Sequence, residues 1–145
     1  MYHKILVPLE NSPTDATVLA HVRALAQHTG AALVLIHVAD GWVARNIEQL
    51  QLRESDEIRG DRAYLDRTLS ELRAAGFDAD AVLAAGNPAD EIAKAASEEG
   101  CDLIAMATHG HRGLDDVVRG SVASELRHRT FVPVLMIREQ KKKGV

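Results

Sequence analysis

Short apolar segments that alternate with helical patterns predict an α/β fold, in which helices cover both faces of a mainly parallel sheet. Five apolar runs, each too short for a helix, recur along the chain. Between them lie segments whose apolar residues recur at helical spacing. The runs are apolar throughout and do not alternate with polar residues, as expected for strands buried on both faces.

Size and composition fit one such domain. The chain has 145 residues, of which 46% are hydrophobic and 26% charged, as in ordinary soluble globular proteins. A chain of this length buries enough surface to fold without disulfides or metals. The single cysteine, Cys101, excludes a disulfide framework or a Cys-based zinc site within one chain. We expect a single domain over residues 1–145, with residues 139–145 as a basic tail.

Charge and hydropathy limit the classes of partner. The net charge is −4, from 17 basic and 21 acidic residues, whereas nucleic-acid binders usually show a basic excess. No apolar run approaches the length that crosses a bilayer, and the first residues lack the layout of a signal peptide. We therefore expect a cytoplasmic protein that binds neither nucleic acid nor membrane.

The first unit is predicted to be a strand, a tight turn and a helix. Residues 5–9 form the first apolar run. Ser12 and Pro13 are residue types favoured at the N-cap and the first helical position. Asp15 stands three residues after Ser12, as in a capping box. Apolar residues at helical spacing then predict a helix that stops at Gly30.

The middle of the chain is less regular. Residues 32–38 predict a second buried strand. The polar segment 41–60 is open to three interpretations: a loop, a flap over a ligand, or the early part of a helix. Helical spacing is clear from Asp61 to Gly76, and a weaker continuation of the same period would start this helix well before residue 60.

The remaining elements follow the same alternation. A helix is expected with Asn87 as N-cap, Pro88 in its first position and an end near Gly100. A glycine-rich stretch, residues 108–120, precedes a short helix over residues 121–129. Three further strands are predicted at residues 79–85, 102–107 and 132–138.

The turn after the fourth predicted strand has features of an anion site. Ligands of open α/β sheets bind beyond the carboxyl ends of the strands, where the strand order reverses. Gly110 follows the strand, and Gly120 and Ser121 open a helix, whose free N–H groups and hydroxyl could cradle a phosphate. Alternatively, the glycines only allow tight connections and Ser121 only caps the helix. Neither a Walker A loop nor a dinucleotide fingerprint is present.

Four motifs together resemble the universal stress protein family. Residues 5–12 (ILVPLENS) resemble its opening strand and D-G-S turn, and residues 86–88 (GNP) resemble its G-x-P turn. Residues 106–122 (MATHG, nine residues, then GSV) resemble its nucleotide signature G-x2-G-x9-G-[S/T]. Residues 132–137 resemble its last strand. The resemblance covers about residues 3–138.

This resemblance implies an open parallel sheet of five strands, order 3-2-1-4-5, sandwiched by helices in a fold like that of the adenine-nucleotide α-hydrolases. It also implies a homodimer, often formed through the C-terminal strand, and in one branch of the family an ATP site between the loops after strands 1 and 4. By matching positions, the adenosine would contact Pro8, Glu10 and Val38. The ribose and phosphates would be bordered by Met106, Ala107 and Gly110. The phosphates would be held by Gly120, Ser121 and Val122.

Two departures from the family pattern keep a second hypothesis open. Glu10 stands where the family has aspartate, and Ala107 where it has the first signature glycine. If residue 107 needs a positive φ, alanine costs about 1 kcal/mol, roughly fivefold to tenfold in affinity; if the position only needs a small side chain, the cost is near nothing. The main hypothesis is a stress-response sensor or switch that binds ATP, or ADP or AMP, with Mg²⁺ as a companion of ATP. The alternative is a homodimeric interaction protein that has lost nucleotide binding.

The other candidate residues do not form a recognisable catalytic set. Arg119, beside the phosphate turn, could pair with phosphate or form a surface salt bridge. His37, inside a strand, is expected to be a buried, hydrogen-bonded histidine or a pocket wall. Asp15 is expected to support its helix, or to approach the phosphates through a metal ion, and Trp42 to cap the core or cover the adenine. No nucleophile elbow or kinase pattern is present, so at most slow ATP hydrolysis or autophosphorylation is expected, and no metal site is predicted.

Overall fold

The computed structural model describes residues 1–40, 51–108 and 122–138, and it places five parallel strands in one sheet of order β3-β2-β1-β4-β5. This confirms the α/β class and the strand order that the family resemblance implies. The strands are β1 (Lys4–Pro8), β2 (Ala32–Asp40), β3 (Ala79–Gly86), β4 (Leu103–Ala107) and β5 (Val134–Ile137). Trp42, Gly110, Arg119, Gly120, Ser121 and the basic tail lie outside the described residues.

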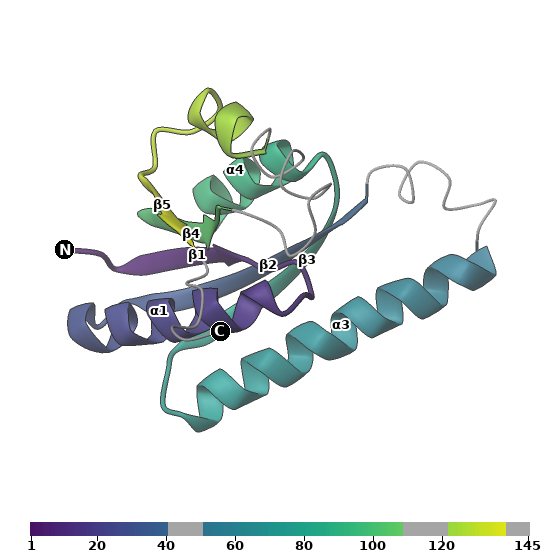
Figure 1. Cartoon of the computed structure of the whole chain (residues 1–145), viewed down its shortest axis with the longest axis horizontal. Helices are drawn as coiled ribbons and strands as arrows, with labels where there is room; N and C mark the ends of the chain where they lie inside the picture. The colour runs from purple at the N-terminus through teal and green to yellow at the C-terminus, as the bar shows by residue number, and fades with distance from the viewer. Residues whose placement is uncertain (41–50, 109–121, 139–145) are drawn as a thin grey trace, which may run out of the picture.

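Helices cover both faces of the sheet (Figure 1). One face carries α1 (Thr14–Thr29) and α3 (Gln51–Ala74), and the other carries α4 (Pro88–Glu98) and the helical residues 122–127. No helix in the described parts of the chain is long and apolar enough to cross a membrane.

Strand residues alternate between two apolar clusters, which explains why the strand sequences are apolar throughout. Ile5 and Val7 of β1 are fully buried against the α1 and α3 side, while Leu6 between them is fully buried against the α4 side. Leu126 of the helical residues 122–127 is also fully buried and fixes that segment to the second cluster. Because both faces are covered, buried strand positions are apolar on both sides of the sheet.

The ends of several elements differ from the sequence-based prediction. β2 continues two residues further, to Asp40, which pairs with Gly86 of β3. β4 starts at Leu103, one residue later than predicted, and the Asp102 carboxylate just before it accepts the backbone N–H groups of His3 and Lys4. These ends are set by pairing and by side-chain contacts that a local apolar pattern does not contain.

The last strand and the long helix also differ. β5 is shorter than the predicted 132–138, because Pro133 has no N–H to donate, although its carbonyl accepts from Ile104 N at 2.9 Å. The interpretation that the helix before β3 begins well before residue 60 is confirmed, since α3 starts at Gln51. The loop interpretation is therefore wrong for residues 51–60.

The first helix is capped differently from the prediction. α1 begins at Thr14 with Pro13 at its N-cap, and no side chain caps it, so the predicted cap by Ser12 is wrong. The predicted stop is confirmed: Gly30 has φ 77° and donates its N–H to the Ala26 carbonyl at 2.8 Å. At α4 the prediction is confirmed as well, because the Asn87 side chain accepts from the N–H of Asp90 at 3.1 Å.

Candidate functional site

A cavity of about 220 Å³ lies at the carboxyl ends of the central strands. β1, β2 and β4 converge there, and α4 and the helical residues 122–127 close its sides. Most of its walls are apolar. The lining residues are Pro8, Leu9, Glu10, Ile36, His37, Val38, Pro88, Ile92, Met106 and Val122.

The cavity accommodates part of a ligand better than a whole large one. Pockets that enclose drug-sized ligands usually measure about 300–1,000 Å³, and this cavity is smaller. Its apolar walls suit a flat ring, such as a nucleobase. The carboxylate of Glu10 at the same cavity is an acceptor for a ligand hydroxyl or amino group.

The structure brings five of the ten sequence-predicted site residues into this one cavity, from four separate places in the fold. They are Pro8, Glu10, Val38, Met106 and Val122. Ala107, the sixth, is buried at the end of β4 beside Met106 but is not part of the lining. The other four, Gly110, Arg119, Gly120 and Ser121, lie outside the described residues.

The remaining lining residues were not predicted as site residues, apart from His37, which was considered as a pocket wall. Pro88 and Ile92 enter because α4 starts next to the cavity, and the G-x-P turn was the signal that could have found Pro88. Leu9 and Ile36 carry no local signal, because they read as ordinary strand residues.

The backbone conformation at Ala107 decides whether alanine lowers ligand affinity through a strained positive φ or has almost no cost. Within the described residues, Asn11 is the one non-glycine residue with a positive φ, and Ala107 lies in regular strand β4. Alanine at this position therefore carries no left-handed strain.

We accordingly expect that Ala107→Gly relieves no backbone strain. Glycine in a strand gains more freedom in the unfolded chain, so the free energy of unfolding should fall by about 0.5–1 kcal/mol. Urea unfolding followed by circular dichroism checks this. A more stable Ala107→Gly protein would contradict the relaxed backbone at residue 107.

Asp15 organises the loop between β1 and α1, which we call the β1–α1 loop (residues 9–13). Its carboxylate accepts the backbone N–H groups of Glu10 at 3.0 Å, Asn11 at 2.8 Å and Ser12 at 3.4 Å. The residue is only 3% exposed. Asp15 thus supports the loop more than the helix, and its contact with Ser12 N is the half of the predicted capping box that forms.

Tyr64 of α3 completes this arrangement. Its hydroxyl donates a short hydrogen bond to the Asp15 carboxylate. Burial, together with the hydrogen bond to Asp15 and the charge of that carboxylate, raises the pKa of Tyr64 far above its ordinary value. The hydroxyl therefore stays protonated and remains a donor to Asp15 at every physiological pH.

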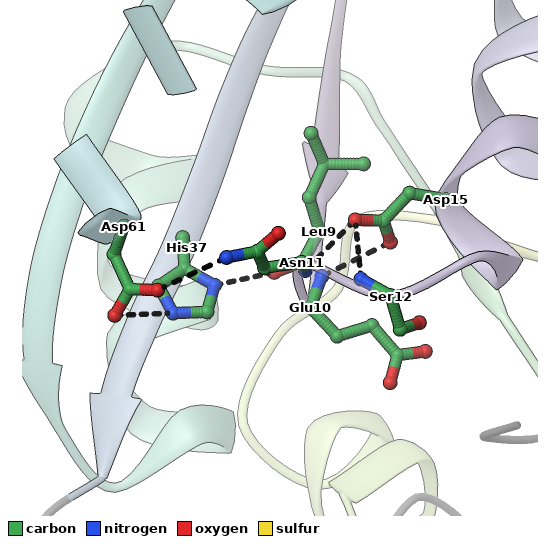
Figure 2. A network of polar contacts seen from close by, with 7 residues as sticks. All are labelled: Leu9, Glu10, Asn11, Ser12, Asp15, His37 and Asp61. Carbon is green, nitrogen blue, oxygen red and sulfur yellow. Dashed lines mark hydrogen bonds and ion pairs between the residues drawn. The ribbon is translucent and has the colours of Figure 1, made fainter. Parts of the chain in front are cut away.

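A second polar connection holds the opposite side of the same loop (Figure 2). His37 places Nδ1 2.9 Å from the Leu9 carbonyl and Nε2 3.2 Å from Oδ2 of Asp61, which belongs to α3. The other carboxylate oxygen of Asp61 lies 3.4 Å from Nδ2 of Asn11. His37 is thus both a hydrogen-bonded histidine and part of the cavity wall, the two alternatives that its strand position suggested.

Cys101 lies away from this cavity, in the apolar cluster on the α4 side. Burial raises the pKa of its thiol to about 11. The thiol is therefore almost fully protonated at neutral pH, which suits a small core residue.

Comparisons with known proteins agree with this fold. The universal stress protein MJ0577 of Methanocaldococcus jannaschii is 26% identical, and the match covers 97% of each chain. In a structural comparison with the solved structure of MJ0577 the TM-score is 0.85 at 29% identity, covering 98% of this chain and 99% of that one.

Two more distant structures share the fold and were solved with adenine nucleotides. A universal stress protein in complex with cAMP gives a TM-score of 0.68 at 20% identity, over 94% of this chain and 97% of that one. The universal stress protein of Archaeoglobus fulgidus in complex with dAMP gives a TM-score of 0.65 at 22% identity, over 94% of this chain and 98% of that one.

Family membership follows from the extent of the match. The sequence profile of the universal stress protein family matches residues 1–138, which include all five strands and every residue that lines the cavity. The chain belongs to the universal stress protein family.

Proposed function

We propose that this protein binds an adenine nucleotide, with the base in the cavity at the carboxyl ends of β1, β2 and β4, and acts as a nucleotide-dependent sensor or switch in a stress response. One observation carries the proposal. Residues from β1, β2, β4 and the helical residues 122–127 that the family pattern assigns to a nucleotide site line the same cavity.

The chemistry of the cavity supports a purine ring. Apolar contact to the two faces of a flat base is offered by Ile36, Val38, Ile92 and Met106. Such contact buries the apolar faces of the ring and needs no hydrogen bond from these side chains. The Glu10 carboxylate would accept a hydrogen bond from the exocyclic amino group or a ribose hydroxyl. The volume of the cavity suits the base, and the phosphates would lie outside it.

The phosphate contacts rest on the signature in the sequence. We assign them to Gly110, Arg119, Gly120 and Ser121, because a glycine-rich turn at a helix start presents backbone N–H groups to an anion. Mg²⁺ would accompany ATP through the phosphates themselves. The relatives solved with cAMP and dAMP support an adenine nucleotide in this fold, and leave the number of phosphates to experiment.

Calorimetric titration of the full chain, stripped of nucleotide, tests the proposal. ATP with Mg²⁺, and cAMP without it, should bind with micromolar or tighter Kd, about −8 kcal/mol or more favourable. Inorganic tripolyphosphate is the control, and it should bind far more weakly because it lacks the base. No heat with either nucleotide at two temperatures would favour the interaction protein that has lost nucleotide binding.

A turnover assay separates a switch from an enzyme. The described part of the site offers binding groups in its lining and the sequence offers no recognised catalytic motif. Incubation with MgATP should therefore give at most slow hydrolysis. Sustained rapid turnover would contradict the switch and establish an enzyme.

A second function is favoured by the edge of the sheet at β5, beside which no other described strand lies. β5 is an edge strand, Met136 on it is 37% exposed, and a groove of about 580 Å³ runs beside it. An exposed apolar edge strand is a ready surface for pairing with another chain. We propose that a second copy pairs here across a two-fold axis, in line with the dimer that the family resemblance implies.

We expect Met136→Lys to shift the protein from dimer to monomer. In the proposed two-fold contact, the lysine ammonium groups of the two copies would lie close together, lose hydration and repel each other. Sedimentation at several concentrations measures this, and the free energy of unfolding of the monomer should stay within about 0.5 kcal/mol. Ala24→Lys, at an exposed position of α1, is the matched control and should remain dimeric. A wild-type protein that sediments as a monomer would overturn the proposed dimer.

A further inference from the structure

The long helix α3 is connected to the β1–α1 loop by two separate polar contacts. Tyr64 reaches the loop through Asp15, and Asp61 reaches it through His37 and Asn11. Asp61 and Tyr64 are three residues apart, so they lie on the same face of α3. One helix face therefore holds both sides of a loop that forms a wall of the cavity.

The loop needs this support because its backbone is unusual. Asn11 has φ 61°, a left-handed conformation that non-glycine residues seldom adopt. Leu9 and Glu10, directly before it, line the cavity. A loop that relaxed at Asn11 would move both of these lining residues, so contacts that fix Asn11 also shape the cavity.

Both ring nitrogens of His37 face acceptors. Nδ1 faces the Leu9 carbonyl and Nε2 faces the Asp61 carboxylate. The side chains of His37 and Asp61 are only 12% and 16% exposed, so water replaces a lost contact poorly.

We propose that Asp61 and His37 are positioning residues, which hold the β1–α1 loop in its ligand-binding shape and make ligand affinity depend on α3. This rests on the proposed function, the binding of an adenine nucleotide in this cavity.

The groups around His37 support this assignment. Asp61 faces it from α3, the Leu9 carbonyl faces it from the loop, and its partner on β3 is the apolar Leu83. Glu10 lines the same cavity, and its carboxylate is a second charge close to the ligand. A Glu10→Gln protein is therefore measured in parallel, so that an effect of the Glu10 charge on the ligand is distinguished from an effect of the loop contacts.

The first experiment titrates cAMP into the full chain at one fixed pH. Asp61→Ala removes the contacts with Nε2 of His37 and Nδ2 of Asn11, and Asp61 is not part of the cavity lining. The affinity for cAMP should fall about tenfold, the effect of one hydrogen bond to a charged group.

Two further variants separate the contact from a general effect of substitution. In Asp61→Asn, the amide can still bond to His37 and Asn11, so this variant should bind cAMP nearly as tightly as wild type. Asp66→Ala, at an exposed position of α3, is the matched control and should behave as wild type.

The second experiment needs no ligand. Amide hydrogen exchange at Glu10, Asn11 and Ser12, whose N–H groups donate to Asp15, reports how firmly the loop is held. At one fixed pH, Asp61→Ala should exchange these amides about tenfold faster than Asp66→Ala, while Asp61→Asn keeps the exchange of wild type and amides of the strands are unchanged.

The outcomes separate the two proposals. Faster loop exchange in Asp61→Ala, with no binding of cAMP or ATP to wild type, would reject the nucleotide site and support the positioning role in the loop. Wild-type affinity for cAMP and unchanged loop exchange in Asp61→Ala would overturn the positioning role and leave the nucleotide site intact. Binding together with both expected changes supports both.

Discussion

Asp15→Ala should lower the free energy of unfolding by about 3 kcal/mol, because buried hydrogen bonds to a charged group are worth about 1.5–3 kcal/mol each and do not add fully. The carboxylate accepts three backbone N–H groups and the Tyr64 hydroxyl. Without it, these donors face no acceptor in a site that is nearly closed to water. The exposed neighbour Asn11 lets water in and relieves part of the loss.

Urea unfolding followed by circular dichroism measures this change. Tyr64→Phe removes one of the four donors and should lower the free energy of unfolding by about 1 kcal/mol. Asp66→Ala deletes a carboxylate from an exposed position of α3 and should change the free energy of unfolding by less than about 0.5 kcal/mol. An Asp15→Ala protein as stable as the Asp66→Ala control would show that the β1–α1 loop does not depend on the carboxylate.

Asp15→Asn makes the test more specific to hydrogen bonding. The amide has nearly the same shape, but one of its two positions is a donor and would face backbone N–H groups that are donors themselves. We expect a loss close to that of alanine. Stability near wild type in this variant would mean that packing at residue 15 matters more than its acceptor oxygens.

The fold could be predicted from the sequence because its signals are local. Continuous apolar runs are what strands covered on both faces require, so the number and order along the chain of all five strands were found. The errors lie at the ends of elements, where contacts distant in sequence compete with local preference. Asp102 binds the backbone N–H groups of His3 and Lys4 just before β4 begins, and the N-cap position of α1 falls on Pro13, so Ser12 makes no side-chain cap.

The candidate site could be predicted only where a motif marks it. Pro8, Val38 and Met106 were named by position in the family pattern, and they share a cavity because parallel strands end at the same edge of a sheet. The support of the site was not predicted. Tyr64 and Asp15 are 49 positions apart, and no spacing rule connects a helix residue to a loop at that distance.

Val38→Trp should abolish nucleotide binding without harming the fold. Val38 is partly buried at the end of β2 and lines the cavity. An indole at this position would extend into the space of about 220 Å³ that we assign to the base. We expect affinity for ATP and cAMP to fall by at least about 100-fold, or about 2.7 kcal/mol, while the free energy of unfolding changes by less than about 1.5 kcal/mol.

Val82→Trp is the matched control for this substitution. Val82 is also a partly buried valine, on β3 beside Ile36 and on the same face of the sheet, but it does not line the cavity. Calorimetric titration of the two proteins separates the location of the base from the general effect of a large residue near the site.

Loss of binding in Val38→Trp alone places the base between β2 and α4. Equal binding in both variants would place the nucleotide elsewhere, and the five residues that share the cavity would then be packing for the strand ends and not a ligand site. Loss in both would mean that the face itself is sensitive to volume, and that result would also count against a localised base pocket.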